Sequence, residues 1–199
     1  MSTSGVPTRR GRPGYDQQGV LDGAVELFNL HGYDATTMDM VAAHLKLSKG
    51  ALYHHISSKE QLLELALDRA LGALEGVLAD SRKLGDAAAR LEFLMNGAVD
   101  VLARELPSVT LLLRLRGNSA VERAALDRRR EFDARVTELI AEAQSDGTIR
   151  RDIDPGAASR MLFGMLNSLT EWYRPDGSGD GPRIAADMLT VALDGLRAP

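Results

Sequence analysis

Residues 36–59, TTMDMVAAHLKLSKGALYHHISSK, constrain the fold most, because they predict two short helices joined by a tight turn. Thr36 or Thr37 can cap the free amides of a first helix, and Asp39 places a carboxylate near its N-terminus. Ser48 can cap a second helix directly after the turn. This arrangement is typical of a helix-turn-helix unit.

The second of these helices has an outer face that suits nucleic acid. Helical periodicity points Leu52 and Ile56 inward and leaves Lys49, Tyr53 and His54 on the outside. A short helix with a small buried face and a basic, aromatic surface fits the major groove of DNA. The residues themselves therefore predict double-stranded DNA as a partner.

The same stretch resembles the DNA-binding domain of the tetracycline-repressor (TetR) family over roughly residues 16–68. The similarity lies in Thr36-Thr37, Val41-Ala42, the run LSKGALYHHI at 47–56, SKEQLL at 58–63 and, upstream, Ala24, Leu27, Phe28, His31-Gly32-Tyr33 and Ala35. Three positions depart from the family pattern, namely Lys46 for a usual glycine, Ala51 for a common Thr or Ser, and Ile56 for a frequent Phe. A non-glycine residue in a left-handed turn costs about 1 kcal/mol, and Ala51 lacks a hydroxyl that could contact DNA.

The resemblance implies which side chains contact DNA. Tyr53 and Lys59 match phosphate-contact positions of the family, although both could also be ordinary surface residues. The predicted DNA-binding residues are Arg10, Arg12, Thr37, Ser48, Lys49, Gly50, Ala51, Tyr53, His54 and Lys59. A homodimer would place its two reading helices, the second helix of each helix-turn-helix, about 34 Å apart in successive major grooves of a palindromic operator.

All segments after residue 14 predict helices. Apolar residues recur with the helical period, no window alternates as a strand would, and we expect about nine helices and no sheet. The predicted fold class is all-α, with a three-helix helix-turn-helix domain at residues 15–60 and a C-terminal helical bundle at 61–199. The resemblance implies that this bundle binds a ligand and forms the dimer. Residues 1–14, rich in Ser, Gly, Pro and Arg, are expected to be a disordered basic arm.

The charge distribution supports a small DNA-binding domain joined to a larger domain that has a different function. The chain carries 24 basic and 28 acidic side chains, and residues 1–60 contain six of each, so the acidic excess lies in residues 61–199. No apolar run approaches the ~20 residues that span a bilayer, and the first residues lack the apolar core of a signal peptide. With no cysteine in the chain, these features favour the cytoplasm and exclude disulfides.

The sequence predicts neither a metal nor another cofactor, and no catalytic activity. His44, His54 and His55 lack the i, i+4 spacing of helical metal ligands, and no Glu-x-x-His occurs. Paired carboxylates, a catalytic triad and a phosphate loop are also missing. The alternative from another class is a helical enzyme or metalloprotein.

The resemblance places a four-helix dimer interface on the last two long helices, about residues 154–173 and 182–197. The final helix carries two adjacent apolar rows, Met188/Ala192 and Leu189/Leu193, wider than one core contact requires. Both rows could instead belong to the core of one subunit. The predicted interface residues are Leu162, Leu169, Met188, Leu189, Ala192 and Leu193.

A small hydrophobic effector is the second predicted partner. Ligand pockets are mostly apolar with few polar anchors, and the predicted lining is Phe93, Met95, Leu112, Arg116, Phe132, Met161, Met165 and Trp172. Arg116 could bind a carboxylate or phosphate group of the ligand, or it could simply be exposed to solvent or form an ion pair. The element Trp172-Tyr173-Arg174-Pro175 resembles a branch of the family that responds to acyl-CoA thioesters or related lipids. The resulting prediction is a repressor released from its operator by such an effector; the alternative is a DNA-binding dimer without one.

Overall fold

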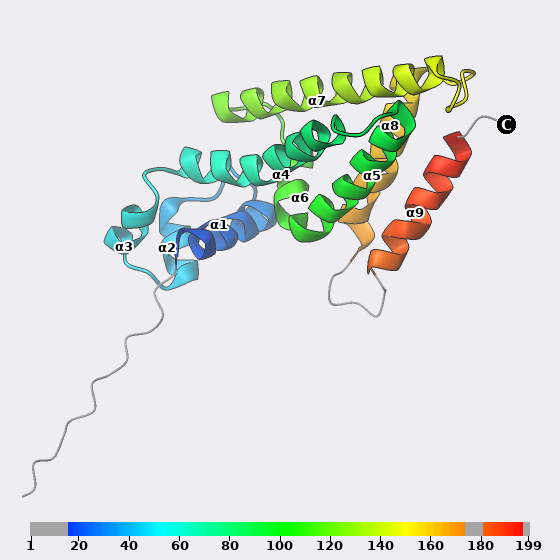
Figure 1. The fold of residues 1–199 in the computed structure, drawn as a ribbon. Helices are drawn as coiled ribbons and strands as arrows, with labels where there is room; N and C mark the ends of the chain where they lie inside the picture. The colour runs from blue at the N-terminus through cyan, green and yellow to red at the C-terminus, as the bar shows by residue number, and fades with distance from the viewer. Residues whose placement is uncertain (1–15, 174–180, 197–199) are drawn as a thin grey trace, which may run out of the picture.

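A computed structural model describes residues 16–173 and 181–196 of the chain, and these residues form nine α-helices and no strand (Figure 1). The helices are α1 (Gln17–His31), α2 (Met38–Leu45), α3 (Lys49–His55), α4 (Lys59–Ser81), α5 (Ala87–Arg104), α6 (Leu106–Leu113), α7 (Ala120–Ser145), α8 (Pro155–Trp172) and α9 (Gly181–Leu196). The predicted all-α fold is confirmed.

Short polar side chains define where most of these helices begin. A side-chain oxygen caps α1, α2, α3, α4, α5, α7 and α8, supplied by Asp16, Thr37, Ser48, Ser58, Asp86, Ser119 and Asp154. Each such cap contributes about 1 kcal/mol to helix stability. Thr37 therefore caps α2, whereas Thr36 is fully buried and donates its hydroxyl to the Gly32 carbonyl at 2.8 Å.

Only one residue, Glu105, separates α5 from α6. Helix α5 ends at Arg104, and α6 begins at Leu106 and ends at Leu113. Pro107 lies in the first turn of α6, where its missing N–H has no intrahelical partner to lose. The proline thus starts the second helix as well as separating it from the first.

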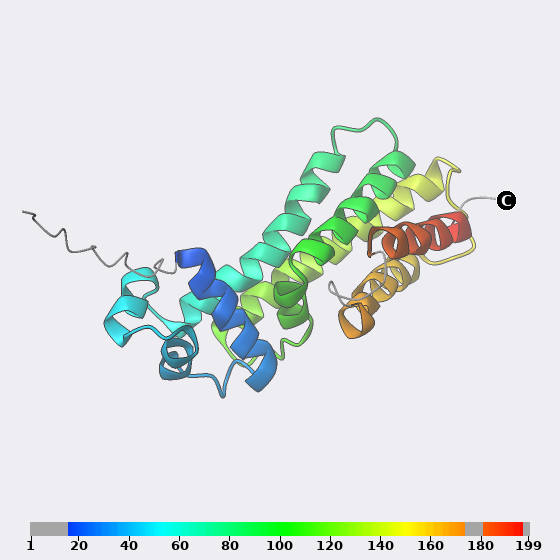
Figure 2. The same cartoon turned by 90° about the horizontal axis from the view of Figure 1, so that it is seen from below.

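The helices are arranged as a small head joined to a longer body (Figure 2). The head consists of α1, α2 and α3. Helix α4 leaves the head and runs into the body, where it packs against α5, α6 and α7. Helices α7 and α8 pack together, and α9 lies against α5 and α8 at the end of the molecule remote from the head.

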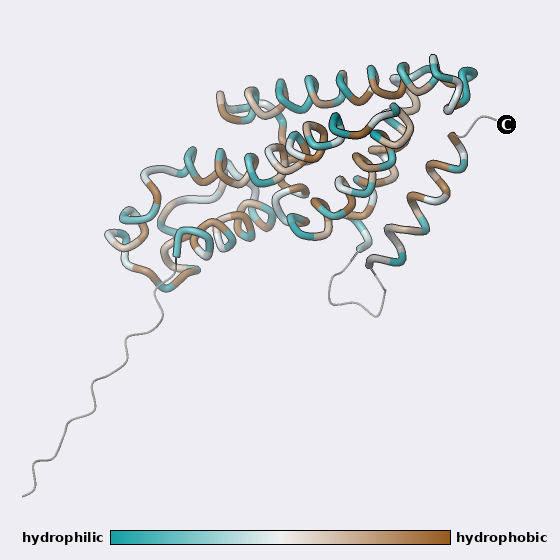
Figure 3. The backbone as a smooth tube through the Cα atoms, in the orientation of Figure 1, coloured by the Kyte–Doolittle hydropathy of each residue, from teal (hydrophilic) through white to brown (hydrophobic). Residues whose placement is uncertain are grey.

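Two clusters of buried apolar side chains hold the described residues together, and α4 contributes to both. The first cluster joins head residues such as Phe28 and Leu52 to body residues such as Leu102 and Leu112. The second fills the far part of the body. Apolar and polar stretches alternate along the helices, as amphipathic packing requires (Figure 3). Head and body therefore share an apolar core.

None of the described helices is both long enough and apolar enough to cross a membrane.

The contact between α4 and α5 leaves no room for a side chain at Gly97. A Cβ built there would lie 2.3 Å from a methyl carbon of Val77, whereas one at Gly76 on α4 would meet nothing within 4 Å. We expect Gly97→Ala to lower the free energy of unfolding by about 1–2 kcal/mol, because overpacking outweighs the gain in helix propensity. Urea denaturation measures the change.

Two variants control this prediction. Gly76→Ala should raise the free energy of unfolding by about 0.5–1 kcal/mol, since it adds helix propensity without a clash. Adding Val77→Ala to Gly97→Ala should restore part of the loss. A Gly97→Ala protein as stable as Gly76→Ala would contradict the close packing of α4 and α5.

Candidate nucleic-acid interface and ligand cavity

The turn between α2 and α3 fixes how the second helix is presented. Lys46 adopts the left-handed conformation, with φ 55° and ψ 36°, and its N–H bonds to the Ala42 and Ala43 carbonyls. Leu52 and Ile56 are buried, at 0% and 1% exposure, and anchor α3 to the head. The predicted helix-turn-helix geometry is thus present, including the left-handed turn at a non-glycine residue.

The outer face of α3 is polar and open. Lys49, His54 and Tyr53 are exposed, and no neighbouring atom lies within 4 Å of a Cβ built on Gly50. Ala51 is half-buried. The structure thus brings the predicted basic and aromatic contacts onto one exposed surface.

The start of α4 is tied to the turn after α1. The Lys59 ammonium donates to the Tyr33 and Asp34 carbonyls at 3.1 and 3.4 Å and lies 4.3 Å from the centre of the Tyr33 ring. Burial, together with the charges of Glu60 and Asp34, raises the pKa of Tyr33 to about 12, so its phenol stays protonated at neutral pH. Lys59 is therefore positioned by the head rather than free in solvent.

Polar contacts join the head to the body beside the shared core. The Asn29 side chain donates to the Pro107 carbonyl at 2.8 Å, and the Arg114 guanidinium donates to the Asn29 carbonyl at 3.1 Å. The Asn118 amide donates to the Asp34 carboxylate at 3.1 Å. These bonds connect α1 and its following turn to α6 and the turn after α6.

A buried carboxylate shapes the turn between α6 and α7. Glu122 is 4% exposed, and one of its oxygens accepts the N–H groups of Arg116, Gly117 and Asn118 at 2.8–3.1 Å. Gly117 has φ +84°, which favours glycine. The turn that carries Asn118 toward the head is thus fixed by the bonds from its backbone N–H groups to the Glu122 carboxylate.

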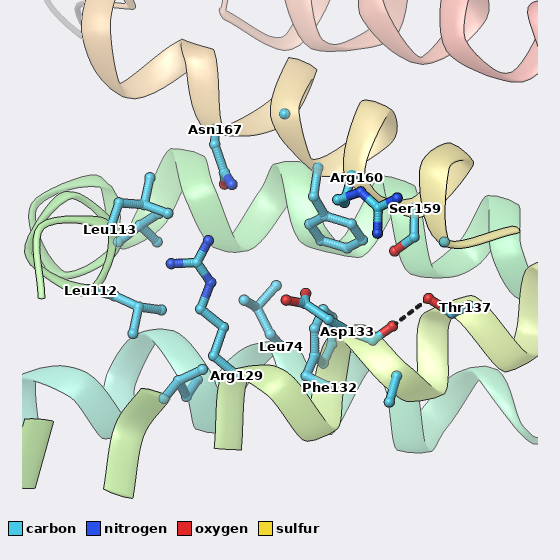
Figure 4. Close-up of a pocket in the computed structure, with 16 residues that line it drawn as sticks. Leu74, Leu112, Leu113, Arg129, Phe132, Asp133, Thr137, Ser159, Arg160 and Asn167 are labelled. Carbon is cyan, nitrogen blue, oxygen red and sulfur yellow. Dashed lines mark hydrogen bonds between the residues drawn. The ribbon is translucent and has the colours of Figure 1, made fainter. Parts of the chain in front are cut away.

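A cavity of about 400 Å³ lies between α4, α6, α7 and α8 (Figure 4). Part of its wall is apolar, made by Leu71, Leu74, Val109, Leu112, Leu113, Phe132 and Phe163. The polar part comes from α7 and α8 and consists of Arg129, Asp133, Thr137, Ser159, Arg160 and Asn167. Its size and mixed lining are those of a small-molecule site.

The charged groups of this cavity come from two facing helices. Arg129 and Asp133 extend from α7, and Arg160 extends from α8 (Figure 4). Removal from water raises the pKa of the Asp133 carboxyl, and the nearby Arg129 acts in the opposite direction. Two guanidinium groups against one carboxylate favour an anionic group on a ligand.

Only two of the eight predicted cavity residues, Leu112 and Phe132, line this cavity. Met95 is buried in the second cluster, and Met165 packs against it. Arg116 instead lines a separate space of about 700 Å³ between head and body. The other three predicted residues, Phe93, Met161 and Trp172, are 43%, 62% and 50% exposed.

The predicted interface residues lie mostly inside the subunit. Leu162, Leu169, Leu189 and Ala192 are at most 9% exposed and belong to the core clusters, because these faces of α8 and α9 turn toward their own body. Met188 and Leu193 are half-buried. Among the side chains of these two helices that the structure describes, the large apolar ones that are exposed are Met161, Trp172 and Val191.

The sequence analysis does not predict the polar cavity residues, although the pattern around one of them carries a signal. Arg129 lies at i+4 from Ala125 and i−3 from Phe132, on the buried stripe of α7. A charged residue on an apolar stripe marks a polar group that faces the interior. Arg160 follows no such pattern, since only the packing of α8 on α7 brings it to the cavity.

Two remaining predictions concern metals and the basic arm. Among the described residues, no group of three or more His, Asp or Glu side chains could hold a metal ion. His44 instead contacts Glu26 at 2.9 Å, and the rings of His54 and His55 meet edge to face. Arg10, Arg12 and the Arg174-Pro175 part of the effector element lie outside the described residues.

Comparison with known proteins agrees with this geometry. Residues 20–66 match the family model for bacterial regulatory proteins of the tetR family, and residues 84–196 match that for the tetracyclin repressor-like C-terminal domain. A helix-turn-helix head on an all-helical body with these matches defines a DNA-binding transcriptional regulator. The chain belongs to the TetR family, whose members bind operator DNA as dimers and are not enzymes.

Individual relatives extend over most of the chain. A solved TetR-family regulator from Streptomyces coelicolor A3 is 42% identical, covers 100% of this chain and 96% of its own, and has a TM-score of 0.81. The transcriptional repressor KstR2 of Rhodococcus jostii (strain RHA1) is 30% identical over 184 residues, which are 90% of each chain. The structure of AibR with isovaleryl coenzyme A and operator DNA is 25% identical, with a TM-score of 0.73 over 88% of this chain and 96% of that one.

Proposed function

We propose that this protein is a homodimeric cytoplasmic repressor that leaves its operator when a small acyl-CoA thioester, or a similar ligand with an apolar and an anionic part, binds the body. The observation that carries the proposal is the cavity between α4, α6, α7 and α8, with its apolar wall and its two arginines. AibR, a relative solved with isovaleryl coenzyme A and operator DNA, supports the same class of ligand.

The apolar wall would receive the acyl group. Leu74, Leu112 and Phe132 come from three different helices, so an acyl group among them would be enclosed on several sides. Burial of each CH₂ group contributes about 0.8 kcal/mol. Arg129 and Arg160 would bind the anionic part through charge-assisted hydrogen bonds.

Release of DNA would follow from the position of the cavity beside α4 and α6. Leu71 of α4 lines the cavity and belongs to the cluster shared with the head, and α6 is bonded to Asn29 of α1 through Arg114. A ligand that binds one position of these helices better than the other shifts the population of head orientations by its differential affinity. The two reading helices of the dimer would then no longer match successive major grooves.

DNA contact by Lys59 is tested through the salt dependence of binding. Lys59→Ala should weaken operator binding and reduce the salt slope by about 0.9 per subunit, because one cationic phosphate contact is lost. Lys83→Ala removes an exposed lysine of the body, paired with Asp80, and should leave the slope unchanged. Fluorescence anisotropy across a salt series measures both, and thermal melting checks that each variant is folded. An unchanged slope in Lys59→Ala would remove this residue from the interface.

The dimer is proposed to form through the exposed apolar side chains of α8 and α9. Met161→Glu combined with Val191→Glu should give a folded monomer, because each charge would be buried between subunits without a partner. Phe93→Glu places the same charge on an exposed apolar position of α5 and should leave the dimer intact. Sedimentation velocity distinguishes these outcomes, and a folded dimer in the double variant would reject this interface.

The class of effector is tested with a series of acyl-CoA thioesters of increasing chain length. Affinity should rise by up to about 0.8 kcal/mol per buried CH₂ and then stop rising when the cavity is full. Ala134→Leu adds carbon atoms to the α7 wall and should shift this limit to a shorter chain. Ala141→Leu makes the same change at an exposed α7 position that does not line the cavity.

Isothermal titration calorimetry provides the affinities for this series. Flat or undetectable binding across all chain lengths would contradict an acyl-CoA effector. A DNA-binding dimer without any effector predicts that result together with unchanged operator binding. Equal chain-length limits in Ala134→Leu and Ala141→Leu would place the acyl group outside this cavity.

A further inference from the structure

The first residue of the predicted reading helix is paired with a carboxylate of the preceding helix. The Lys49 ammonium lies 2.8 Å from the Asp39 carboxylate, and the two side chains are 67% and 65% exposed. The hydrogen bond from Lys49 to Asp39, followed by the attraction of the opposite charges, raises the pKa of Lys49. Lys49 is therefore cationic at neutral pH, but its charge already has a partner.

Asp39 is not required to cap its own helix. Thr37 accepts the Met40 N–H at 3.2 Å, and Asp39 lies in the first turn of α2, where a carboxylate adds only a modest interaction with the helix dipole. The carboxylate points to the start of α3, on the surface proposed to meet DNA. Near phosphates, a negative charge at that place is unfavourable unless it has another role.

We propose that Asp39 is a specificity-determining residue that lowers the affinity for nonspecific DNA by occupying Lys49. This proposal rests on the proposed placement of α3 in the major groove. At a random site, DNA offers Lys49 mainly phosphate oxygens, and a contact with them competes with the attraction of Asp39 and is opposed by the repulsion between Asp39 and the phosphate. At an operator, guanine O6 and N7 can accept hydrogen bonds from Lys49 and compensate for that cost.

The consequence is a larger difference between the affinity for the operator and the affinity for nonspecific DNA. Nonspecific binding depends on cationic side chains that neutralise phosphates and thereby release the counterions of DNA. Pairing Lys49 with Asp39 therefore removes one such phosphate contact per subunit. Specific binding loses less, since base contacts are available only there. Asp39 thus increases the ratio of specific to nonspecific affinity while it decreases both.

The test compares Asp39→Asn with the wild-type dimer on two duplexes, one of random sequence and one selected from a random library by the wild-type protein. For the random duplex, we expect a salt slope steeper by about 0.9 per subunit and an affinity roughly eightfold higher per subunit at 0.1 M salt, which is the effect of one more phosphate contact. The selected duplex should gain less, so the specificity ratio falls. Fluorescence anisotropy measures both affinities.

A matched control comes from the body. Asp80 at the end of α4 and Lys83 in the following turn form another exposed ion pair, with the same separation of 2.8 Å. Asp80→Asn makes the same change of charge away from the head and should alter neither affinity. The melting temperature of each variant checks that the effect is not one of folding.

Lys49→Ala separates the failure of this inference from that of the proposed DNA surface. Lys49→Ala should weaken binding to the selected duplex, and in its presence Asp39→Asn should steepen the salt slope on the random duplex far less than it does when Lys49 is present, because no cation is released. An unchanged random-duplex affinity in Asp39→Asn, or an equal gain on both duplexes, would overturn the role of Asp39. If Lys49→Ala leaves both affinities unchanged, the placement of α3 on DNA fails as well.

Discussion

The apolar face of α4 is the constraint on which the rest of the structure depends. Leu63 and Leu67 pack in the cluster that includes the head, Leu71 and Leu74 form part of the cavity wall, and Leu78 is buried in the second cluster. Protein interiors are close-packed, so a helix held along its length cannot adjust at one point alone. A ligand that displaces α4 at the cavity therefore acts on the same rigid element that carries the head.

Polar contacts provide a second connection between body and head. The turn after α6 is fixed by Glu122 and reaches Asp34 through Asn118, and the Asp34 carbonyl in turn accepts from Lys59. The head is thus bonded to the body at the same turn that positions a predicted phosphate contact. This arrangement relates the position of α6 to the DNA surface without requiring any change within α3.

The helix-turn-helix could be predicted from the sequence because its signals are local. Thr37, Ser48 and the inward-facing Leu52 determine caps and faces within a few residues of themselves. The family pattern, rather than the residue itself, predicts the left-handed turn at Lys46.

The cavity and the subunit surface depend on which helix faces meet, and this is long-range information. Leu162 is buried while its neighbour Met161 is 62% exposed, since adjacent helical residues point about 100° apart. Both are apolar, so hydrophobicity alone could not assign one to the core and the other to the surface. Arg129 was recognisable as a charge on a buried stripe, but its partner Arg160 comes from a different helix.

The most direct test of the account is the distance between the two heads of the dimer. The chain contains no cysteine, so Ala43→Cys on the exposed side of α2 gives one spin label per subunit. Pulsed electron paramagnetic resonance should give a narrow distribution of distances between the two spin labels when the dimer is bound to a selected operator duplex. A saturating acyl-CoA should shift it and abolish DNA binding. An unchanged distribution at saturating ligand, with DNA nevertheless released, would contradict transmission through α4 and α6.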